Sequence, residues 1–240
     1  MQGIKGLIFD YGGTLDSNGQ HWAAVIWNSY QKINIEISRE QFNEAYVYAE
    51  RKMALQPIIL ATYNFLQVLE AKIAAQFEYL KTQNIDLSQE LIKSIAEDGY
   101  KIAQKNTSIS KPILENLNTK YPIVMVSNFY GNLASVLRDF EINHHFSDII
   151  ESAVVGVRKP DPAIYALGIK KINLKPENCL VIGDSYSKDM IPAKKCGCQT
   201  LWLKGEGWND DENINNVHAD RVFYDIIELE SIIDNWLPKK

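Results

Sequence analysis

Polar side chains of the kinds that hold a cation and a phosphate follow four apolar segments of this sequence. Asp10 ends the first segment and precedes a glycine turn, and Ser127 ends the second. Lys159 follows the third segment, and Asp184 follows the fourth directly after a glycine. Hard cations such as Mg²⁺ prefer carboxylate oxygens, whereas a lysine, a hydroxyl and turn amides can hold an anion. The set predicts a site for a divalent cation and a phosphate-like anion.

Each of these residues also has an explanation that involves no chemistry. Aspartate and glycine favour turns at strand ends, and Asp184 or Ser127 could cap a following helix. Lys159 could be a solvated loop charge. Capping and turn formation do not account for four such groups at four successive segment ends, so we interpret the set as a functional site.

The apolar segments have the pattern of buried parallel strands, and helical segments separate them. We expect strands at residues 4–11, 121–126, 148–155, 179–182, 200–203 and 221–224. Ser110 before Pro112, and Asp161 before Pro162, have the form of helix starts, and Gly197 is suited to end a helix. This alternation predicts an α/β fold, a Rossmann-like doubly wound parallel sheet with helices on both faces. Such sheets bind ligands beyond the carboxyl ends of their strands, where the polar residues collect.

Residues 20–105 lack strand signals and have helical periodicity. Apolar residues from Trp22 to Ile33 share one helical face, and a second such stripe follows Ser38 and Gln41, which form a capping-box pattern. We therefore predict an inserted all-α helical cap domain at 19–105. The α/β core would comprise residues 1–18 and 106–240.

The composition is that of an ordinary globular protein. Of 240 residues, 46% are hydrophobic and 23% charged, and the net charge is −5. The acidic balance argues against nucleic acid as a partner, and no apolar run is long enough to span a membrane. The amino-terminal residues lack the apolar core of a signal peptide, and the three cysteines lack a framework spacing. We expect reduced thiols in a cytoplasmic protein that is a monomer or homodimer.

Four motifs occur in a characteristic order: FDYGGTLD at 9–16, VSN at 126–128, VRKPDP at 157–162 and GDSYSKD at 183–189. In this order they resemble the haloacid dehalogenase-like (HAD) hydrolase superfamily, in a member with a helical cap inserted after the first motif. The resemblance covers the whole chain, and the ordered set is more specific than any single motif.

The resemblance implies a magnesium-dependent phosphatase acting on a small phosphorylated metabolite. Asp10 would be the nucleophile that forms an aspartyl-phosphate intermediate, with Ser127 and Lys159 as the other catalytic residues. The roles implied for the remaining residues are as follows: Asp10, Asp184 and the backbone carbonyl of Gly12 would hold Mg²⁺, Thr14 and Asn128 would contact the substrate, and Asp189 would orient metal-bound water or Lys159.

One position departs from the phosphatase pattern. Phosphatases of this family usually carry an acid/base aspartate two residues after the nucleophile, where this chain has Gly12. A positioned acid/base is worth about 10²–10⁴ in rate. Asp16 or His21 could supply the proton instead, although a turn role for Asp16 and a helix-start role for His21 also fit the sequence.

Gly12 leaves three alternatives open. In a 2-haloacid dehalogenase, Arg39 could bind the substrate carboxylate, although such enzymes need no metal and generally lack a carboxylate like that of Asp184. In a phosphonatase-like hydrolase, Lys52 could form the Schiff base. The third alternative is a catalytically weak or inactive relative that acts in binding or regulation. The cap is rich in aromatic residues, but the sequence does not show which of them face the site, so it does not identify the substrate.

Overall fold

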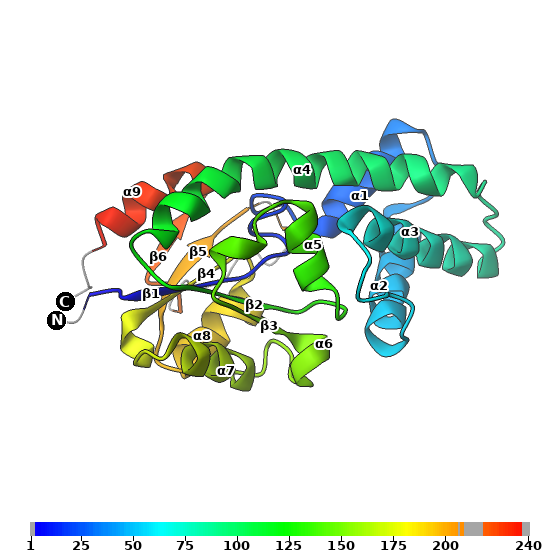
Figure 1. The fold of residues 1–240 in the computed structure, drawn as a ribbon. Coiled ribbons are helices and arrows are strands. Elements are labelled where there is room, and N and C mark those ends of the chain that lie inside the picture. Colours follow the sequence, from blue (N-terminus) through cyan, green and yellow to red (C-terminus); the bar gives the residue numbers. More distant parts are fainter. Residues whose placement is uncertain (1–2, 206, 209–217, 237–240) are drawn as a thin grey trace.

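A six-stranded parallel sheet forms the centre of the molecule. The computed structural model describes residues 3–205, 207–208 and 218–236, and it orders the strands β3-β2-β1-β4-β5-β6 (Figure 1). The strands are β1 (Gly6–Phe9), β2 (Ile123–Ser127), β3 (Asp148–Glu151), β4 (Cys179–Gly183), β5 (Gln199–Leu203) and β6 (Arg221–Phe223). Leu7 of β1 is paired with Ile123 of β2 on one side and Leu180 of β4 on the other. The carboxyl ends of β2, β1 and β4 therefore lie side by side.

Successive residues of β1 face opposite sides of the sheet, as strand geometry requires. Leu7 and Phe9 join the larger hydrophobic core, whereas Ile8 packs with residues of α7 (Ala163–Ile172) on the other face. The first of these faces is covered by α4 (Glu90–Asn118), α5 (Leu133–Asp139) and α9 (Leu229–Asp234), as Figure 1 shows. The short α8 (Ile191–Lys195) lies beside α7. Helices on both faces confirm the doubly wound arrangement.

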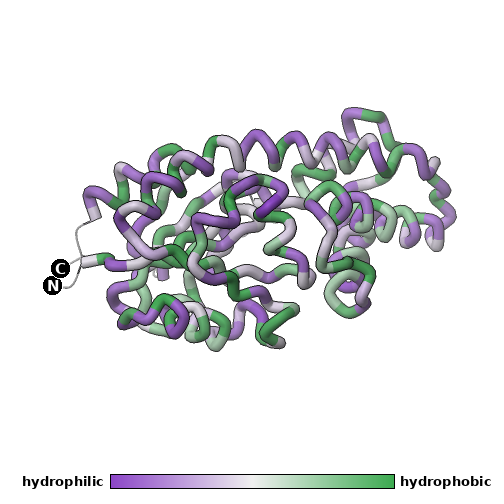
Figure 2. The backbone as a smooth tube through the Cα atoms, in the orientation of Figure 1, coloured by the Kyte–Doolittle hydropathy of each residue, from purple (hydrophilic) through white to green (hydrophobic). Residues whose placement is uncertain are grey.

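The residues between β1 and β2 are helical, as expected. They form α1 (Trp22–Lys32), α2 (Arg39–Leu55), α3 (Phe65–Thr82) and α4. The predicted capping box is present, because Ser38 and Gln41 satisfy each other's backbone N–H groups at the start of α2. Figure 2 shows hydrophilic and hydrophobic residues alternating along α4, which runs from this helical region back over the sheet.

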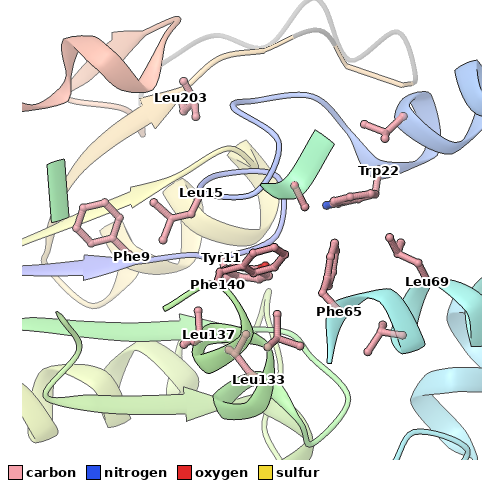
Figure 3. Packing of buried hydrophobic residues seen from close by; sticks show 14 of the residues in the cluster. Phe9, Tyr11, Leu15, Trp22, Phe65, Leu69, Leu133, Leu137, Phe140 and Leu203 are labelled. Carbon is pink, nitrogen blue, oxygen red and sulfur yellow. The ribbon is translucent and has the colours of Figure 1, made fainter. Parts of the chain in front are cut away.

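Aromatic side chains join the helical region to the sheet core. Phe65 at the start of α3 lies edge-on to Trp22 of α1, with 5.1 Å between ring centroids. It also meets Phe140, after α5, at 5.7 Å and Tyr11, after β1, at 6.2 Å. Figure 3 shows these rings in one continuous layer. The hydrophobic cluster therefore extends from the sheet into the helices.

Two sequence predictions about secondary structure were wrong, and the first concerns a helix start. No helix begins at Ser110 and Pro112, because α4 continues through both residues. Ser110 is buried, and its hydroxyl donates to the carbonyl of Leu15 at 3.2 Å and to that of Asn106 at 3.1 Å. Packing across α4 thus outweighs the local preference of proline for a helix start. The boundary proposed between residues 105 and 106 falls inside this continuous helix, and the division into cap and core remains a proposal.

The third strand is shorter than predicted. β3 ends at Glu151, and residues Ser152–Val155 form the short helix α6 instead. The Glu151 carboxylate accepts hydrogen bonds from the backbone N–H groups of Gly131 and Leu133, so it turns toward the loop after β2. Val154 is 70% exposed, so this apolar run is not the buried strand that its composition predicted.

Two other local predictions are confirmed. Asp161 accepts a hydrogen bond from the backbone N–H of Ala163 at 2.9 Å where α7 begins. Gly197 has a φ of +85° after α8. Among the described residues, no helix has the length and apolar character needed to cross a membrane.

Candidate active site

Asp10 lies at the centre of the carboxyl edge of the sheet, directly after β1. Its backbone N–H donates to the carbonyl of Ile182 in β4, which extends the strand pairing by one residue. Its carboxylate oxygen Oδ1 accepts from the Ser127 hydroxyl at 3.0 Å and from Lys159 Nζ at 2.6 Å. The residue is 6% exposed. The structure therefore brings together Asp10, Ser127 and Lys159, which are far apart in the sequence.

Lys159 bridges two carboxylates. Its Nζ lies 2.6 Å from Asp10 Oδ1 and also 2.6 Å from Asp189 Oδ1. Burial by itself would lower the pKa of Lys159, but the two aspartates hold it above its usual value. A buried ammonium between two carboxylates is well placed to neutralise negative charge that a reaction brings to Asp10.

Asn128 holds the backbone of Lys159. Its Nδ2 donates to the Lys159 carbonyl at 3.1 Å, and its Oδ1 accepts from the Lys159 N–H at 2.8 Å. This pair of hydrogen bonds fixes the loop that presents the lysine. The predicted contact of Asn128 with substrate is not tested by this arrangement and stays a prediction.

Asp184 faces Asp10 across the glycine turn. The Thr14 hydroxyl lies 3.1 Å from Asp184 Oδ1 and 3.4 Å from Asp10 Oδ2, so it lies between the two carboxylates. A Cβ atom on Gly13 would lie 2.2 Å from Asp184 Oδ2, and the φ of Gly13 is +92°. Only glycine therefore allows this close approach of the turn to Asp184.

The carboxylates fit a divalent cation. Asp10, Asp184 and Asp189 each offer an oxygen, and these oxygens lie within 4.8 Å of one another. Burial, followed by the charges of Asp10 and Asp189, raises the pKa of Asp184 well above its usual value. Lys159 is the only cation bonded to this group among the described residues. A metal ion would supply the missing positive charge and keep Asp184 ionised.

Asp189 is already engaged by several donors. Its Oδ1 accepts from Lys159 and from the Tyr165 hydroxyl at 2.7 Å, and its Oδ2 accepts from the Ser185 N–H at 2.9 Å. These bonds suit a residue that orients Lys159. Asp10 and Asp184 are the better candidates for metal ligands.

Sequence reasoning missed Tyr165. This residue lies in the first turn of α7, where the sequence resembles an ordinary apolar helix start. Its ring lies 5.4 Å from Lys159 Nζ, and its hydroxyl reaches Asp189. The sequence feature that could have indicated this role is the position of the tyrosine, which follows the lysine of the third motif closely and lies on the helix that this motif begins.

The two alternative proton donors are held in structural contacts. Asp16 accepts from the Gly13 N–H at 2.8 Å and from Trp22 Nε1 at 2.9 Å, and burial raises its pKa to about 7. His21 caps α1 through Nδ1, which accepts from the Ala23 N–H. Burial lowers the pKa of His21 to about 4, so the ring is neutral near pH 7.

The residues of the other two enzyme alternatives also have structural partners. Arg39 donates to the backbone carbonyl of Trp208 at 2.9 Å, and its guanidinium lies 4.3 Å from the Trp208 ring centroid. Lys52 pairs with Glu78, whose side chain is 52% exposed. Neither arrangement favours a substrate carboxylate at Arg39 or a Schiff base at Lys52.

The parallel sheet, the aspartates at its strand ends and the lysine that bridges two of them define an α/β protein with an acidic site at the carboxyl edge of the sheet. The family model of haloacid dehalogenase-like hydrolases matches residues 4–197. The chain therefore belongs to the haloacid dehalogenase-like hydrolases.

Several proteins with similar sequences are named as phosphatases. The chain is 24% identical over 234 residues to a phosphoglycolate phosphatase of Vibrio cholerae, covering 97% of this chain and 98% of the relative. It is 29% identical over 94 residues to a glyceraldehyde 3-phosphate phosphatase of Pyrococcus furiosus, covering 39% of each.

Solved structures share the fold over nearly the whole chain. A HAD-hydrolase from Bacillus subtilis, YfnB, bound to magnesium, matches with a TM-score of 0.59, 16% identity and coverage of 97% of this chain and 100% of that one. The L-2-haloacid dehalogenase of Xanthobacter autotrophicus matches with a TM-score of 0.62, 15% identity and coverage of 98% and 100%. At these identities the likeness shows the fold alone.

Proposed function

We propose that this hydrolase is a magnesium-dependent phosphatase that acts on a small phosphate ester through an aspartyl-phosphate on Asp10. The observation that carries the proposal is the Asp10 carboxylate, held by Lys159 and Ser127 and facing Asp184. Both named relatives are phosphatases of small phosphate esters, and the Vibrio cholerae enzyme aligns along nearly its whole length.

In the proposed first step, the Asp10 carboxylate attacks the phosphorus atom and the ester P–O bond breaks. The leaving oxygen takes up a proton from solvent water, and Lys159 and Ser127 neutralise and orient the transferring group. Water then attacks the phosphorus of the aspartyl-phosphate, which releases phosphate and restores the Asp10 carboxylate. Asp10, Asp184 and the carbonyl of Gly12 would hold Mg²⁺, which supplies positive charge to the phosphate oxygens.

Gly12 affects the first step most. No side chain at this position can protonate the leaving oxygen, and Asp16 is engaged by Gly13 and Trp22. Esters whose leaving group is stable as an anion should therefore react faster than alkyl esters. This predicts a steeper dependence on leaving-group pKa than in an enzyme with a positioned acid.

The test measures phosphate release from p-nitrophenyl phosphate with MgCl₂ and with EDTA. We expect magnesium-dependent turnover that Asp10→Asn lowers by at least about 10³-fold. Asp86→Asn is the matched control, since Asp86 makes an exposed ion pair with Lys81, and it should behave as the wild type.

Other outcomes separate the alternatives. Metal-independent chloride release from L-2-chloropropionate would overturn the phosphatase in favour of a dehalogenase. Magnesium binding without turnover of any phosphate ester would favour a non-catalytic relative.

A further inference from the structure

An ion pair between a buried lysine and a partly exposed glutamate lies, with two tyrosines, where the helical region meets the loop after β2. Lys72 Nζ of α3 is 2.5 Å from Glu50 Oε1 of α2, and the Tyr130 hydroxyl donates to Glu50 Oε2 at 2.9 Å. Lys72 Nζ also lies 5.5 Å from the ring centroid of Tyr46 and 5.7 Å from that of Tyr130. We call Tyr46, Glu50, Lys72 and Tyr130 the cap–core cluster.

The cluster adjoins two of the segments that follow the central strands and border Asp10. Tyr130 belongs to the loop after β2, which begins with Asn128 directly after Ser127 at the end of the strand. On the other side, the ring of Tyr46 lies 6.0 Å, between centroids, from the ring of His21, which follows the turn after β1. The cluster therefore contacts the loop after β2 through Tyr130 and the segment after β1 through His21.

Glu50 is the part of the pair that a ligand can reach. Its side chain is 36% exposed, whereas that of Lys72 is 8% exposed. Burial acts to raise the pKa of Glu50, but Lys72 and the hydroxyl of Tyr130 outweigh it and hold the pKa below its usual value. For Lys72, burial acts to lower the pKa, and the charge of Glu50 outweighs it and raises the pKa to about 12. Both groups are therefore ionised, and Glu50 presents a fixed anionic acceptor.

An ion pair with one buried partner is weak evidence for a role in stability, because two apolar side chains of similar volume often serve the fold equally well. Its position suggests a role in recognising the part of the ester that departs. A substrate hydroxyl can donate to Glu50. A substrate carboxylate placed there would be repelled by Glu50, and Lys72 is already neutralised by its own partner.

We propose that Glu50, held by Lys72 and Tyr130, selects phosphate esters with an uncharged, hydroxylated leaving group and disfavours those with a carboxylate. This inference rests on the proposed phosphatase function and names the substrate class of the same site. The glyceraldehyde 3-phosphate phosphatases among the relatives act on an ester of this class, whereas the phosphoglycolate phosphatase does not.

The direct test compares glycerol 3-phosphate with glycerate 3-phosphate, which differ by one hydroxymethyl group in place of a carboxylate. We expect the wild type to favour glycerol 3-phosphate by at least about tenfold in kcat/KM, since about 1.4 kcal/mol of like-charge repulsion corresponds to that factor. A preference for glycerate 3-phosphate, or for phosphoethanolamine over both, would overturn the inference.

Glu50→Gln removes the charge and keeps the shape. We expect it to reduce the preference for glycerol 3-phosphate at least about fivefold. Glu78→Gln is the matched control, because Glu78 pairs with Lys52 in the same helical region but faces solvent. It should leave the ratio unchanged.

Glu50→Gln leaves the Lys72 charge buried without its partner, so a second variant guards against misfolding. Glu50→Gln with Lys72→Met removes both charges, and it should likewise bring the ratio toward one. If the ratio of the two kcat/KM values stays within twofold of the wild-type ratio in both folded variants, the inference is wrong.

Turnover of p-nitrophenyl phosphate distinguishes a failure of the selectivity assigned to Glu50 from a failure of the proposed phosphatase function. If that ester is hydrolysed with Mg²⁺ but Glu50→Gln has no effect on the ratio, the inference fails and the phosphatase stands. If no phosphate ester is hydrolysed, the proposed function fails and this inference fails with it.

Discussion

The carboxylate oxygen Oδ2 of Asp16 lies 4.0 Å from the position that a Cβ atom on Gly12 would occupy. No other heavy atom of the described residues, apart from Gly12 and its chain neighbours, comes within that distance. The turn after Asp10 thus has room for a side chain at residue 12, and an existing carboxylate borders that room.

Gly12→Asp should therefore be accommodated and should raise turnover. A positioned acid typically contributes about 10²–10⁴ in rate, and we expect the lower end because Asp16 would repel the new carboxylate. The gain should be larger for an alkyl ester such as glycerol 3-phosphate than for p-nitrophenyl phosphate, whose leaving group needs no proton. Gly12→Asn controls for shape without the acid. Equal turnover in folded Gly12→Asp and wild-type protein would mean that protonation is not limiting.

Tyr165→Phe should lower kcat about tenfold and change KM little. The Tyr165 hydroxyl donates to Asp189 at 2.7 Å, and Asp189 holds Lys159. A hydrogen bond to a charged group is worth about 1.5–3 kcal/mol, and part of that loss should appear as a less well oriented Lys159. Steady-state kinetics on one ester measures both parameters.

The control for Tyr165 is Tyr30→Phe, which removes a buried hydroxyl that donates to Gln76 within the helical region. That variant should lose stability and keep kcat. If Tyr165→Phe keeps the wild-type kcat, as Tyr30→Phe should, then Tyr165 has a packing role only.

The stability of the wild type should fall between about pH 4 and pH 7 because of Asp16. Burial raises the pKa of Asp16 to about 7 in the folded chain, against about 3.9 when unfolded. The folded state therefore binds the proton of Asp16 more tightly than the unfolded state does. The resulting contribution to the free energy of unfolding is complete below the unfolded pKa and is lost as the pH rises through 7. At about 1.4 kcal/mol per pKa unit, the loss is at most about 4 kcal/mol.

Urea unfolding of the wild type and Asp16→Asn from pH 4 to pH 8 measures this contribution. The free energy of unfolding of the variant should decline less over that interval. Parallel curves would show that Asp16 is ionised throughout, held so by Gly13 and Trp22.

Trp208→Ala should loosen the contact between the helical region and the loop after β5. Trp208 is 8% exposed, its Nε1 donates to Asn43 at 3.0 Å, and its ring meets Phe42 of α2 at 5.5 Å and the guanidinium of Arg39. Loss of a buried tryptophan typically costs about 3–5 kcal/mol.

Hydrogen exchange locates that effect. Amides of α1 and α2 should exchange faster in Trp208→Ala than in the wild type. Trp236→Ala is the comparison, since Trp236 lies against Arg221 at the other end of the sheet, and it should leave those amides protected. Unchanged exchange in α1 and α2 would show that Trp208 does not secure them.

The sequence by itself determined the strands and the residues at their ends. Short apolar runs mark buried strands, and the carboxyl ends of neighbouring parallel strands meet at one edge. Asp10, Ser127, Lys159 and Asp184 were therefore predictable as a group. The capping box at Ser38 was predictable for a different reason, because its two partners, Ser38 and Gln41, are close together in the chain.

Only the tertiary structure decided the features whose partners are distant in sequence. Pro112 lies inside α4 because buried contacts such as that of Ser110 with Leu15 outweigh a local preference. Tyr165 reaches Asp189, and Glu50 pairs with Lys72, only after helices and loops pack. Periodicity and motifs report local geometry, whereas the energy of a buried charge depends on whichever groups the fold places beside it.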